Sequence, residues 1–260
     1  MELIAAILTR DEERHIQACI ESVRWTDAVL VVDSFSSDNT VALAQAAGAV
    51  VIQHPWENYS VQRNVALEKA RSETFAAQWL FFIDADERAT PELAGEIRQV
   101  IASGTETGWW VPRHNYILGH RMRGAGWWPD YQLRLLRPDC AGYDAQRAVH
   151  EEANLEGASG YLQQPLIHYN YETLAQFHAK QRRYTDYDVG ILLQKGITPH
   201  VYTPYLQAVR HFWWRFITLN GWRDGLHGIR LSALMATYEM RKYRKLRAMI
   251  SRHSEPGERT

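Results

Sequence analysis

The sequence lacks the features that define disulfide-rich, zinc-binding and membrane-spanning proteins. Its 260 residues include only two cysteines, Cys19 and Cys140, which are far apart and lack metal-ligand spacing, so neither a zinc site nor a disulfide framework is indicated. No apolar run reaches the roughly 20 residues that a spanning helix needs, because charged residues interrupt the most aromatic region. We therefore expect a chain in the reducing cytoplasm that does not cross a bilayer.

An excess of charge of either sign is also missing. The chain has 29 Lys and Arg against 30 Asp and Glu, for a formal net charge of -1. This balance gives no global case for a nucleic-acid partner, so we predict none and look for local clusters instead. The opening apolar run at Leu3–Leu8 has no basic segment before it, which predicts a first strand and not a signal peptide.

Strand-like and helix-like segments alternate over the first ninety or so residues. The apolar runs are 3–8, 29–32, 49–52 and 79–83, and helical patterns follow Asp11, extend through Leu43 and cover 60–70. This alternation predicts an α/β fold, with a doubly wound, mostly parallel, Rossmann-like sheet. Polar loops at 9–12, 33–38 and 84–87 each follow a strand, so we expect them to converge at one edge of the sheet.

The pattern changes after Trp109. Aromatic residues alternate with glycine and proline, which indicates hairpins and loops. A strand is expected over Tyr161–His168, and helices over Thr173–Gln194 and Tyr205–Met249. We expect a helical extension at 171–250 and a disordered tail at 251–260.

Carboxylates at the expected strand ends have a clear chemical use. Asp84 and Asp86 can direct oxygen ligands at Mg²⁺ or Mn²⁺, which would neutralise a leaving diphosphate, or they can simply form a solvated loop. Asp33 can accept hydrogen bonds from a base or ribose, although Asp38 nearby suits a helix cap. Arg63 can pair with phosphate or with the 84–87 loop, or lie exposed.

Four segments, in this order, resemble the successive signatures of family 2 glycosyltransferases with the GT-A fold: ILTRDEE at 7–13, VVDSFSSDNT at 31–40, QRN at 62–64 and FIDADE at 82–87. The resemblance implies a GT-A catalytic domain at 1–170. Its nucleotide-sugar half would be 1–107 and its acceptor half 108–170, followed by the helical extension.

The resemblance also implies roles for single residues. Thr9, Glu12 and Asp33 would contact the nucleoside, and Asp84 would lie near the ribose. Asp86 would hold the metal against the diphosphate, and Arg63 would help to fix the donor. The family inverts the anomeric centre, so one carboxylate must act as general base on the acceptor hydroxyl. Many members of the family carry this base in a Glu-Asp or Asp-Asp pair, and the sequence has no obvious one. Glu151, slightly ahead of Asp130, is then the candidate base, and either residue can instead have a structural role.

The block from Gly126 to Glu152 resembles a branch that includes lipopolysaccharide-core glucosyltransferases. Here Trp127 and Trp128 can stack on sugar rings or pack in a core, and Arg134 is expected at the acceptor. His150, ahead of His168, is a candidate third metal ligand or a structural histidine.

The C-terminal third suggests a surface partner. Val209, Phe212, Trp213 and Phe216 share one helical face, and the run at 241–247 has five basic residues among seven. These patterns favour attachment to an anionic membrane surface, at the inner face of the cytoplasmic membrane; packing on the catalytic domain or a second subunit is the alternative. The segment 220–228 resembles the tail of the same branch, which favours a lipid-linked acceptor.

The expected function is therefore inverting, metal-dependent transfer of a sugar from a nucleotide-diphosphate sugar to a glycan or lipid-linked acceptor, in lipopolysaccharide-core or cell-surface glycan synthesis. Two alternatives are weaker. A sugar-phosphate nucleotidyltransferase should have a glycine-rich loop after the first strand, where Thr9–Glu12 has no glycine. A non-catalytic glycan-binding scaffold would not need the charged residues Asp33, Arg63, Asp84 and Asp86.

Overall fold

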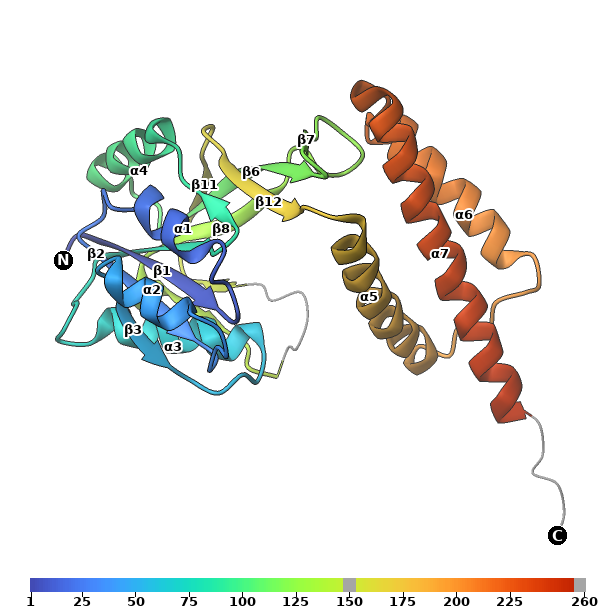
Figure 1. Cartoon of the computed structure of the whole chain (residues 1–260), viewed down its shortest axis with the longest axis horizontal. Coiled ribbons are helices and arrows are strands. Elements are labelled where there is room, and N and C mark those ends of the chain that lie inside the picture. Colours follow the sequence, from blue (N-terminus) through green and yellow to red (C-terminus); the bar gives the residue numbers. More distant parts are fainter. Residues whose placement is uncertain (147–152, 255–260) are drawn as a thin grey trace, which may run out of the picture. The chain divides into compact units, whose positions relative to one another are not determined.

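The computed structural model describes residues 1–146 and 153–254, which form two compact units (Figure 1). The first unit contains residues 1–114 and 130–169 and is built around a β-sheet. The second contains residues 115–129 and the chain from 170 onward, and it is mainly helical.

In the described residues the main sheet has ten strands. The first four lie parallel in the order β3-β2-β1-β4, with these bounds: β1 Leu3–Thr9, β2 Ala28–Asp33, β3 Val50–Gln53 and β4 Trp79–Asp84. Strands β8 (Tyr131–Leu136) and β6 (Gly108–Ile117) continue the sheet in antiparallel pairing. This doubly wound, mostly parallel arrangement confirms the predicted fold class.

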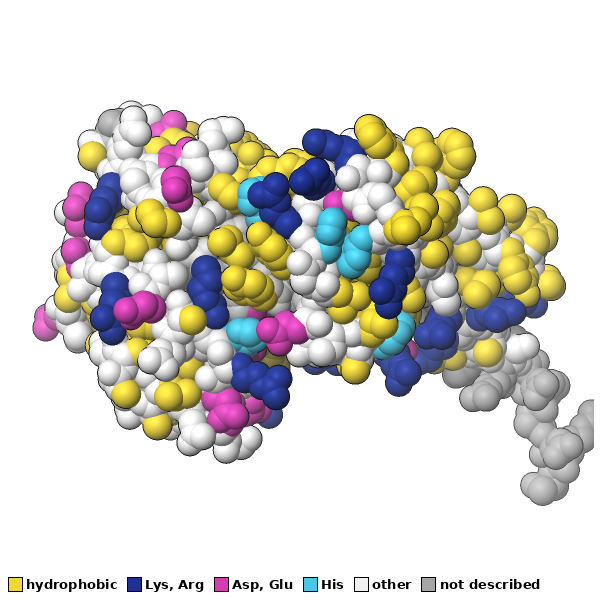
Figure 2. Space-filling model, turned by 45° about the horizontal axis from the view of Figure 1, so that its top comes forward, with side chains coloured by type: hydrophobic (Ala, Val, Ile, Leu, Met, Phe, Trp, Pro, Cys, Tyr) yellow, Lys and Arg dark blue, Asp and Glu magenta, His cyan; other side chains and the backbone are white. Residues whose placement is uncertain are grey.

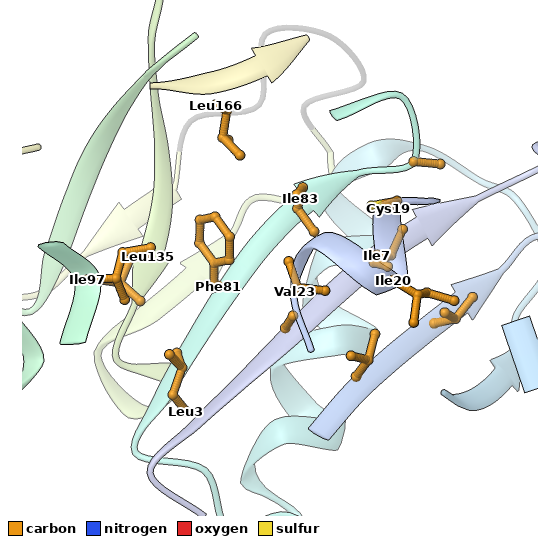
Figure 3. Close-up of a cluster of buried hydrophobic side chains, with 14 of the residues drawn as sticks. Leu3, Ile7, Cys19, Ile20, Val23, Phe81, Ile83, Ile97, Leu135 and Leu166 are labelled. Carbon is orange, nitrogen blue, oxygen red and sulfur yellow. The ribbon is translucent and has the colours of Figure 1, made fainter. Parts of the chain in front are cut away.

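Helices cover both faces of the parallel strands. One face packs against α1 (Ile16–Ser22), α2 (Thr40–Ala46) and α4 (Pro91–Ser103), and the other against α3 (Tyr59–Arg71). Alternate residues of β1 therefore enter two separate cores, which explains its unbroken apolar sequence. Figure 3 shows the first core, where side chains of α1 meet those of β1 and β4.

The parallel register brings three strand ends to one edge of the sheet. Thr9 lies opposite Asp33 in the β1–β2 pair, and Leu8 lies opposite Asp84 in the β1–β4 pair. The polar loops after β1, β2 and β4 therefore begin at the same level. The convergence predicted from the sequence is present.

The remaining strands of the first unit are short. They are β5 Glu87–Arg88, β9 Ala141–Tyr143, β10 Ala153–Leu155 and β11 Ser159–Tyr161, with a 3-10 turn at Pro138–Cys140. Strand β12 (Leu166–Tyr171) pairs with β5. The single strand expected at Tyr161–His168 is wrong: it is split because Pro165 has no N–H, and the N–H groups of Gln163 and Gln164 donate to the Glu96 carboxylate.

The second unit consists of a short strand and long helices. They are β7 His120–Arg121, α5 Leu174–Gln194, α6 Thr203–Trp213 and α7 Gly225–Ser254, with a π-helical turn at Trp214–Thr218 and a 3-10 turn at Gly221–Asp224. A capping box between Thr173 and Gln176 begins α5. The small core of this unit includes Phe177, Leu231 and Tyr238.

A sharp corner separates α6 from α7, within the stretch 205–249 that the sequence predicted to be helical. Asn220 and Gly225 both have φ of 56°, a conformation that ends a right-handed helix. At Gly228, a Cβ atom would lie 1.9 Å from the carbonyl oxygen of Gly221, so the corner requires glycine. Helix α7 also continues through Ser251 to Ser254, where a disordered tail was expected. Within the described residues, no helix combines the length and the apolar character that a membrane span requires.

Candidate active site

Asp33 lies at the centre of a dense hydrogen-bond network at the end of β2. Its carboxylate accepts bonds from Thr9 Oγ1 (3.2 Å), Gln53 Nε2 (3.0 Å) and the Ser36 N–H (3.0 Å), and also from the Ser36 hydroxyl. Burial alone would raise the pKa of Asp33, but these donors hold it below its usual value. The result is a fixed, ionised acceptor at the sheet edge.

The loop after β1 places a second carboxyl group beside the same edge. The N–H of Glu12 donates to Thr40 Oγ1 at 2.8 Å, which holds the loop against the start of α2. Burial, together with the negative charges of Asp86, Asp38 and Asp84, raises the pKa of Glu12 to about 7. Glu12 therefore lies in a negative field that a cation would relieve.

Asp84 is held by an arginine that lies inside the protein. Arg134 on β8, 2% exposed, donates Nη1 to Asp84 Oδ1 at 3.0 Å and forms a second close bond through Nη2. Burial would raise the pKa of Asp84, but Arg134, with help from Arg63 and Arg113, keeps it far below its usual value. Asp84 is thus a fixed anion with both oxygens engaged.

Glu87 extends this pairing into a chain of alternating charge. Its buried carboxylate accepts bonds from Arg134 Nη2 (2.9 Å), Arg113 Nη1 (3.1 Å) and the Asp84 N–H (2.9 Å). Arg113 also binds Asp130 through Nε (3.0 Å) and Nη2 (2.7 Å). The chain Asp84–Arg134–Glu87–Arg113–Asp130 therefore links the strand end of β4 to the start of β8.

Asp86 has a different neighbour. Its Oδ2 lies 3.4 Å from Nε2 of His168 on β12, and its side chain is 28% exposed. A carboxylate and an imidazole suit Mn²⁺ or Mg²⁺ when substrate phosphate and water supply the other ligands. Within residues 1–146 and 153–254, no group of three His, Cys, Asp or Glu residues could hold a metal by itself. The expected ligand His150 lies outside these residues.

Arg63 lies beneath the strand ends and not on the outer surface. It is buried, with its guanidinium 5.0 Å from the ring centre of Phe82 and 5.6 Å from that of Tyr143. Asn64 fixes the helix at this point by exchanging two hydrogen bonds with the backbone of Tyr143. Arg63 therefore contributes positive potential near Asp84, as its effect on that carboxyl group shows.

The residues expected at the acceptor do not all lie in the unit that holds these carboxylates. Trp127 and Trp128 belong to the second unit. There Trp127 packs edge-on against Tyr171 and lies under the guanidinium of Arg215, at 5.5 Å. Glu151, the first candidate for the base, lies outside the described residues. These assignments remain predictions.

Sequence reasoning missed Gln53, Arg113 and the role of Glu87. Glu87 belongs to the FIDADE segment at 82–87, and its position shortly after the end of β4 was the signal that could have identified it. Gln53 ends β3 as Asp33 ends β2, so the parallel register predicts their meeting. Arg113 gives no sequence signal, because its partners come from distant segments.

Comparison with known proteins places this arrangement in a family. Residues 5–154 match Glycosyl transferase family 2. Over 235 residues the chain is 29% identical to the lipopolysaccharide core biosynthesis glycosyltransferase LpsC of Rhizobium meliloti, with 88% of this chain and 85% of that protein covered. It is also 35% identical over 121 residues to an uncharacterized glycosyltransferase of Rickettsia conorii, covering 46% and 41% of the two chains.

A solved structure supports the fold independently. TarS 1-349 of S. aureus in complex with UDP-GlcNAc superposes with a TM-score of 0.51 at 13% identity, covering 97% of this chain and 92% of that one. At this identity the likeness concerns the fold alone. With the family match over residues 5–154, it follows that the chain belongs to glycosyl transferase family 2 and has the GT-A fold.

Proposed function

We propose that the protein transfers a sugar, with inversion, from a UDP-sugar to a lipopolysaccharide-core or other lipid-linked glycan acceptor. The observation that carries the proposal is the meeting of Asp33, Asp84 and Asp86 at one sheet edge, in the order of the family signatures. The structural relative TarS is described in complex with UDP-GlcNAc, which supports a UDP-sugar donor. Similarity to LpsC over 88% of the chain supports the lipopolysaccharide core as the acceptor class.

The donor would bind along residues 1–107. In this proposal Asp33, with Thr9 and Glu12 beside it, accepts hydrogen bonds from the nucleoside, and Asp84 lies near the ribose. Asp86 and His168 would hold Mg²⁺ or Mn²⁺, which would supply Lewis-acid stabilisation of the leaving diphosphate. Arg63 adds positive potential beneath the site. The burial of Arg134 supports a role in fixing Asp84, in place of the direct acceptor contact expected from the sequence.

The acceptor would meet residues 108–170, with Trp127 or Trp128 stacking on a sugar ring. A carboxylate removes the proton of the acceptor hydroxyl, the oxygen bonds to the anomeric carbon, and the diphosphate leaves with the bonding electrons. Two bonds from Arg113 and one from Gln132 already engage Asp130, which supports a positioning role for it. Glu151 therefore stays the first candidate for the base.

The decisive experiment measures nucleotide-diphosphate release from a panel of nucleotide sugars with Mn²⁺ or Mg²⁺. We expect release from a UDP-sugar, and a loss of about a hundredfold or more for Asp86→Asn, because its carboxylate would hold the metal. Asp139→Asn removes an exposed carboxylate and is the matched control. His168→Gln should weaken Mn²⁺ binding in the presence of UDP. If no donor binds or reacts, the non-catalytic scaffold becomes the better interpretation.

A second pair of variants separates the two candidate bases. Glu151→Gln should abolish transfer to acceptor while donor binding persists. Asp130→Asn should lower both sugar transfer and donor binding, because it would release Arg113 from the charge chain. Equal transfer by Glu151→Gln and the wild type would remove Glu151 from the mechanism.

A further inference from the structure

Helix α6 shows the reverse of the polarity expected for a helix on the surface of a water-soluble unit. Its side facing solvent carries Leu206, Val209 and Trp213, which are 61%, 70% and 62% exposed. These residues are three or four positions apart, so they share one face of the helix. A surface helix normally turns such a face toward the core.

Polar groups occupy the opposite side of the same segment. Arg215, in the π-helical turn that continues α6, donates Nε to His211 Nε2 at 2.8 Å and Nη1 to the carbonyl oxygen of Ala125 at 2.6 Å. Burial and the charge of Arg215 lower the pKa of His211 to about 4, so this imidazole is neutral near pH 7. His211 and Arg215 therefore have partners within the unit, whereas Leu206, Val209 and Trp213 face out.

The start of α7 adds a second exposed apolar strip. Trp222, in the 3-10 turn before α7, is 57% exposed, and Leu226 and Ile229, three positions apart in the first turn of α7, are 85% and 42% exposed. Helix α7 packs against α6. Figure 2 shows hydrophobic side chains gathered over this part of the helical unit, with Lys and Arg side chains beside them. We call the following residues the apolar surface: Leu206, Val209, Trp213, Trp222, Leu226 and Ile229.

Exposed charge within the stretch of chain that carries the apolar surface has one sign. Between Asp188 and Glu239 the sequence has a single acidic residue, Asp224, and it is buried. The same stretch exposes Arg210, Arg223 and Arg230. An exposed apolar surface whose own stretch of chain exposes only positive charge complements anionic lipid headgroups. A second copy of the chain on this surface would bring like charges together.

The basic run at 241–247 is less suited to that partner than its sequence suggests. Lys242 lies 2.8 Å from the Glu239 carboxylate and 3.5 Å from that of Asp188, and Lys245 lies 2.6 Å from that of Asp186. These intramolecular pairs offset part of its charge. The stronger candidate for membrane contact therefore lies earlier in the chain.

We infer that the apolar surface of α6 and the start of α7 docks the protein on a bilayer containing anionic lipids. The aliphatic and tryptophan side chains enter the headgroup boundary, where tryptophan is favoured, and the flanking arginines meet lipid phosphates. The inference concerns the second unit alone. It stands or falls separately from the chemistry at the strand ends.

The test is sedimentation of the full chain with vesicles of phosphatidylethanolamine and phosphatidylglycerol, compared with vesicles of phosphatidylcholine. We expect binding to the anionic vesicles that added salt weakens. Leu206→Ser, Val209→Ser and Leu226→Ser combined should weaken it about a hundredfold or more, since each buried apolar side chain contributes roughly a tenfold factor. Val50→Ser, on the edge strand of the first unit, is the matched control and should bind as the wild type does.

Two further variants make the result specific. Changing Arg210, Arg223 and Arg230 to Gln should weaken binding more than changing Lys242 and Lys245 to Gln. Circular dichroism and UDP-sugar hydrolysis check that each variant is folded, and hydrolysis reports separately on the proposed transferase function. The inference is overturned if the wild type stays in the supernatant, if the triple serine variant still binds, or if the wild type is a dimer that the triple variant dissociates.

Discussion

At the scale of single residues, the site depends on charges that neutralise one another inside the protein. Arg134 donates hydrogen bonds to both Asp84 and Glu87, and it is almost fully buried. Removing one partner of such a pair costs more than the pair contributes, because the other charge stays buried without compensation. The stability of the first unit should therefore be sensitive to this arginine.

Arg134→Met is expected to lower the free energy of unfolding by about 3 kcal/mol or more, since it leaves buried carboxylates without their partner. Urea denaturation followed by tryptophan fluorescence measures it. Arg24→Met breaks an exposed pair with Glu21 and should cost less than about 1 kcal/mol. Equal costs for the two changes would show that the buried chain adds nothing.

Glu12 predicts a pH dependence of stability. Because its pKa is about 7 in the folded protein and 4.5 as the ordinary value, the folded state holds an extra proton between these values. Its contribution to stability should therefore fall as pH rises from about 4.5 to 7, by of order 2 kcal/mol. Urea denaturation in chelating buffer across this pH range should show that Glu12→Gln removes the pH-dependent fall in stability. Glu57→Gln, at an exposed position, is the control, and an unchanged slope in Glu12→Gln contradicts the prediction.

Some of these residues could be predicted and others could not. Asp33 and Asp84 end strands with clear apolar runs, and Asp86 lies in the turn directly after the second of them, so their convergence follows from a parallel sheet. The bond between Arg134 and Asp84 joins two segments fifty residues apart, and it depends on the antiparallel pairing of β8 with β4. Sequence alone gives no register for that pair. The sequence therefore could not show that Arg134 pairs with the carboxylates of Asp84 and Glu87.

At the scale of elements, the first half was predictable because its strands are buried on both faces. The same reasoning did not locate the corner between α6 and α7. There the apolar spacing continues on both sides, and backbone conformation at Asn220 and Gly225 breaks the helix. The apolar face expected on α6 was also only half right: Val209 and Trp213 are exposed, whereas Phe212 and Phe216 are partly buried.

Two glycines should respond oppositely to replacement by alanine. Gly228→Ala is expected to destabilise the helical unit by about 2–4 kcal/mol, because its Cβ would lie 1.9 Å from the Gly221 carbonyl oxygen. Gly190→Ala, inside α5 with nothing within 4 Å of the added Cβ, should stabilise it by about 0.5–1 kcal/mol. Thermal melts by far-UV circular dichroism compare them. A stable Gly228→Ala variant would mean that the corner can open without cost.

At the scale of the whole molecule, the two units should respond to different ligands. UDP with Mn²⁺ should protect the loops after β1, β2 and β4 from hydrogen exchange and leave α6 unchanged. At a hundred times its Kd, a ligand adds about 2.7 kcal/mol to the stability of the unit that binds it. Anionic vesicles should protect α6 and leave those loops unchanged. Protection of both units by either ligand would show that they are energetically coupled.

The outward face of α6 has a consequence for the protein in water. Helix α6 exposes a leucine, a valine and a tryptophan, while Arg215 in the turn after it bonds within the unit, so this segment is surface-active. Purified without lipid, the protein should adsorb to hydrophobic resins and to the air–water boundary. The amount of protein lost during concentration should then increase with the area of the vessel wall and of the air–water interface. A mild detergent should prevent this loss.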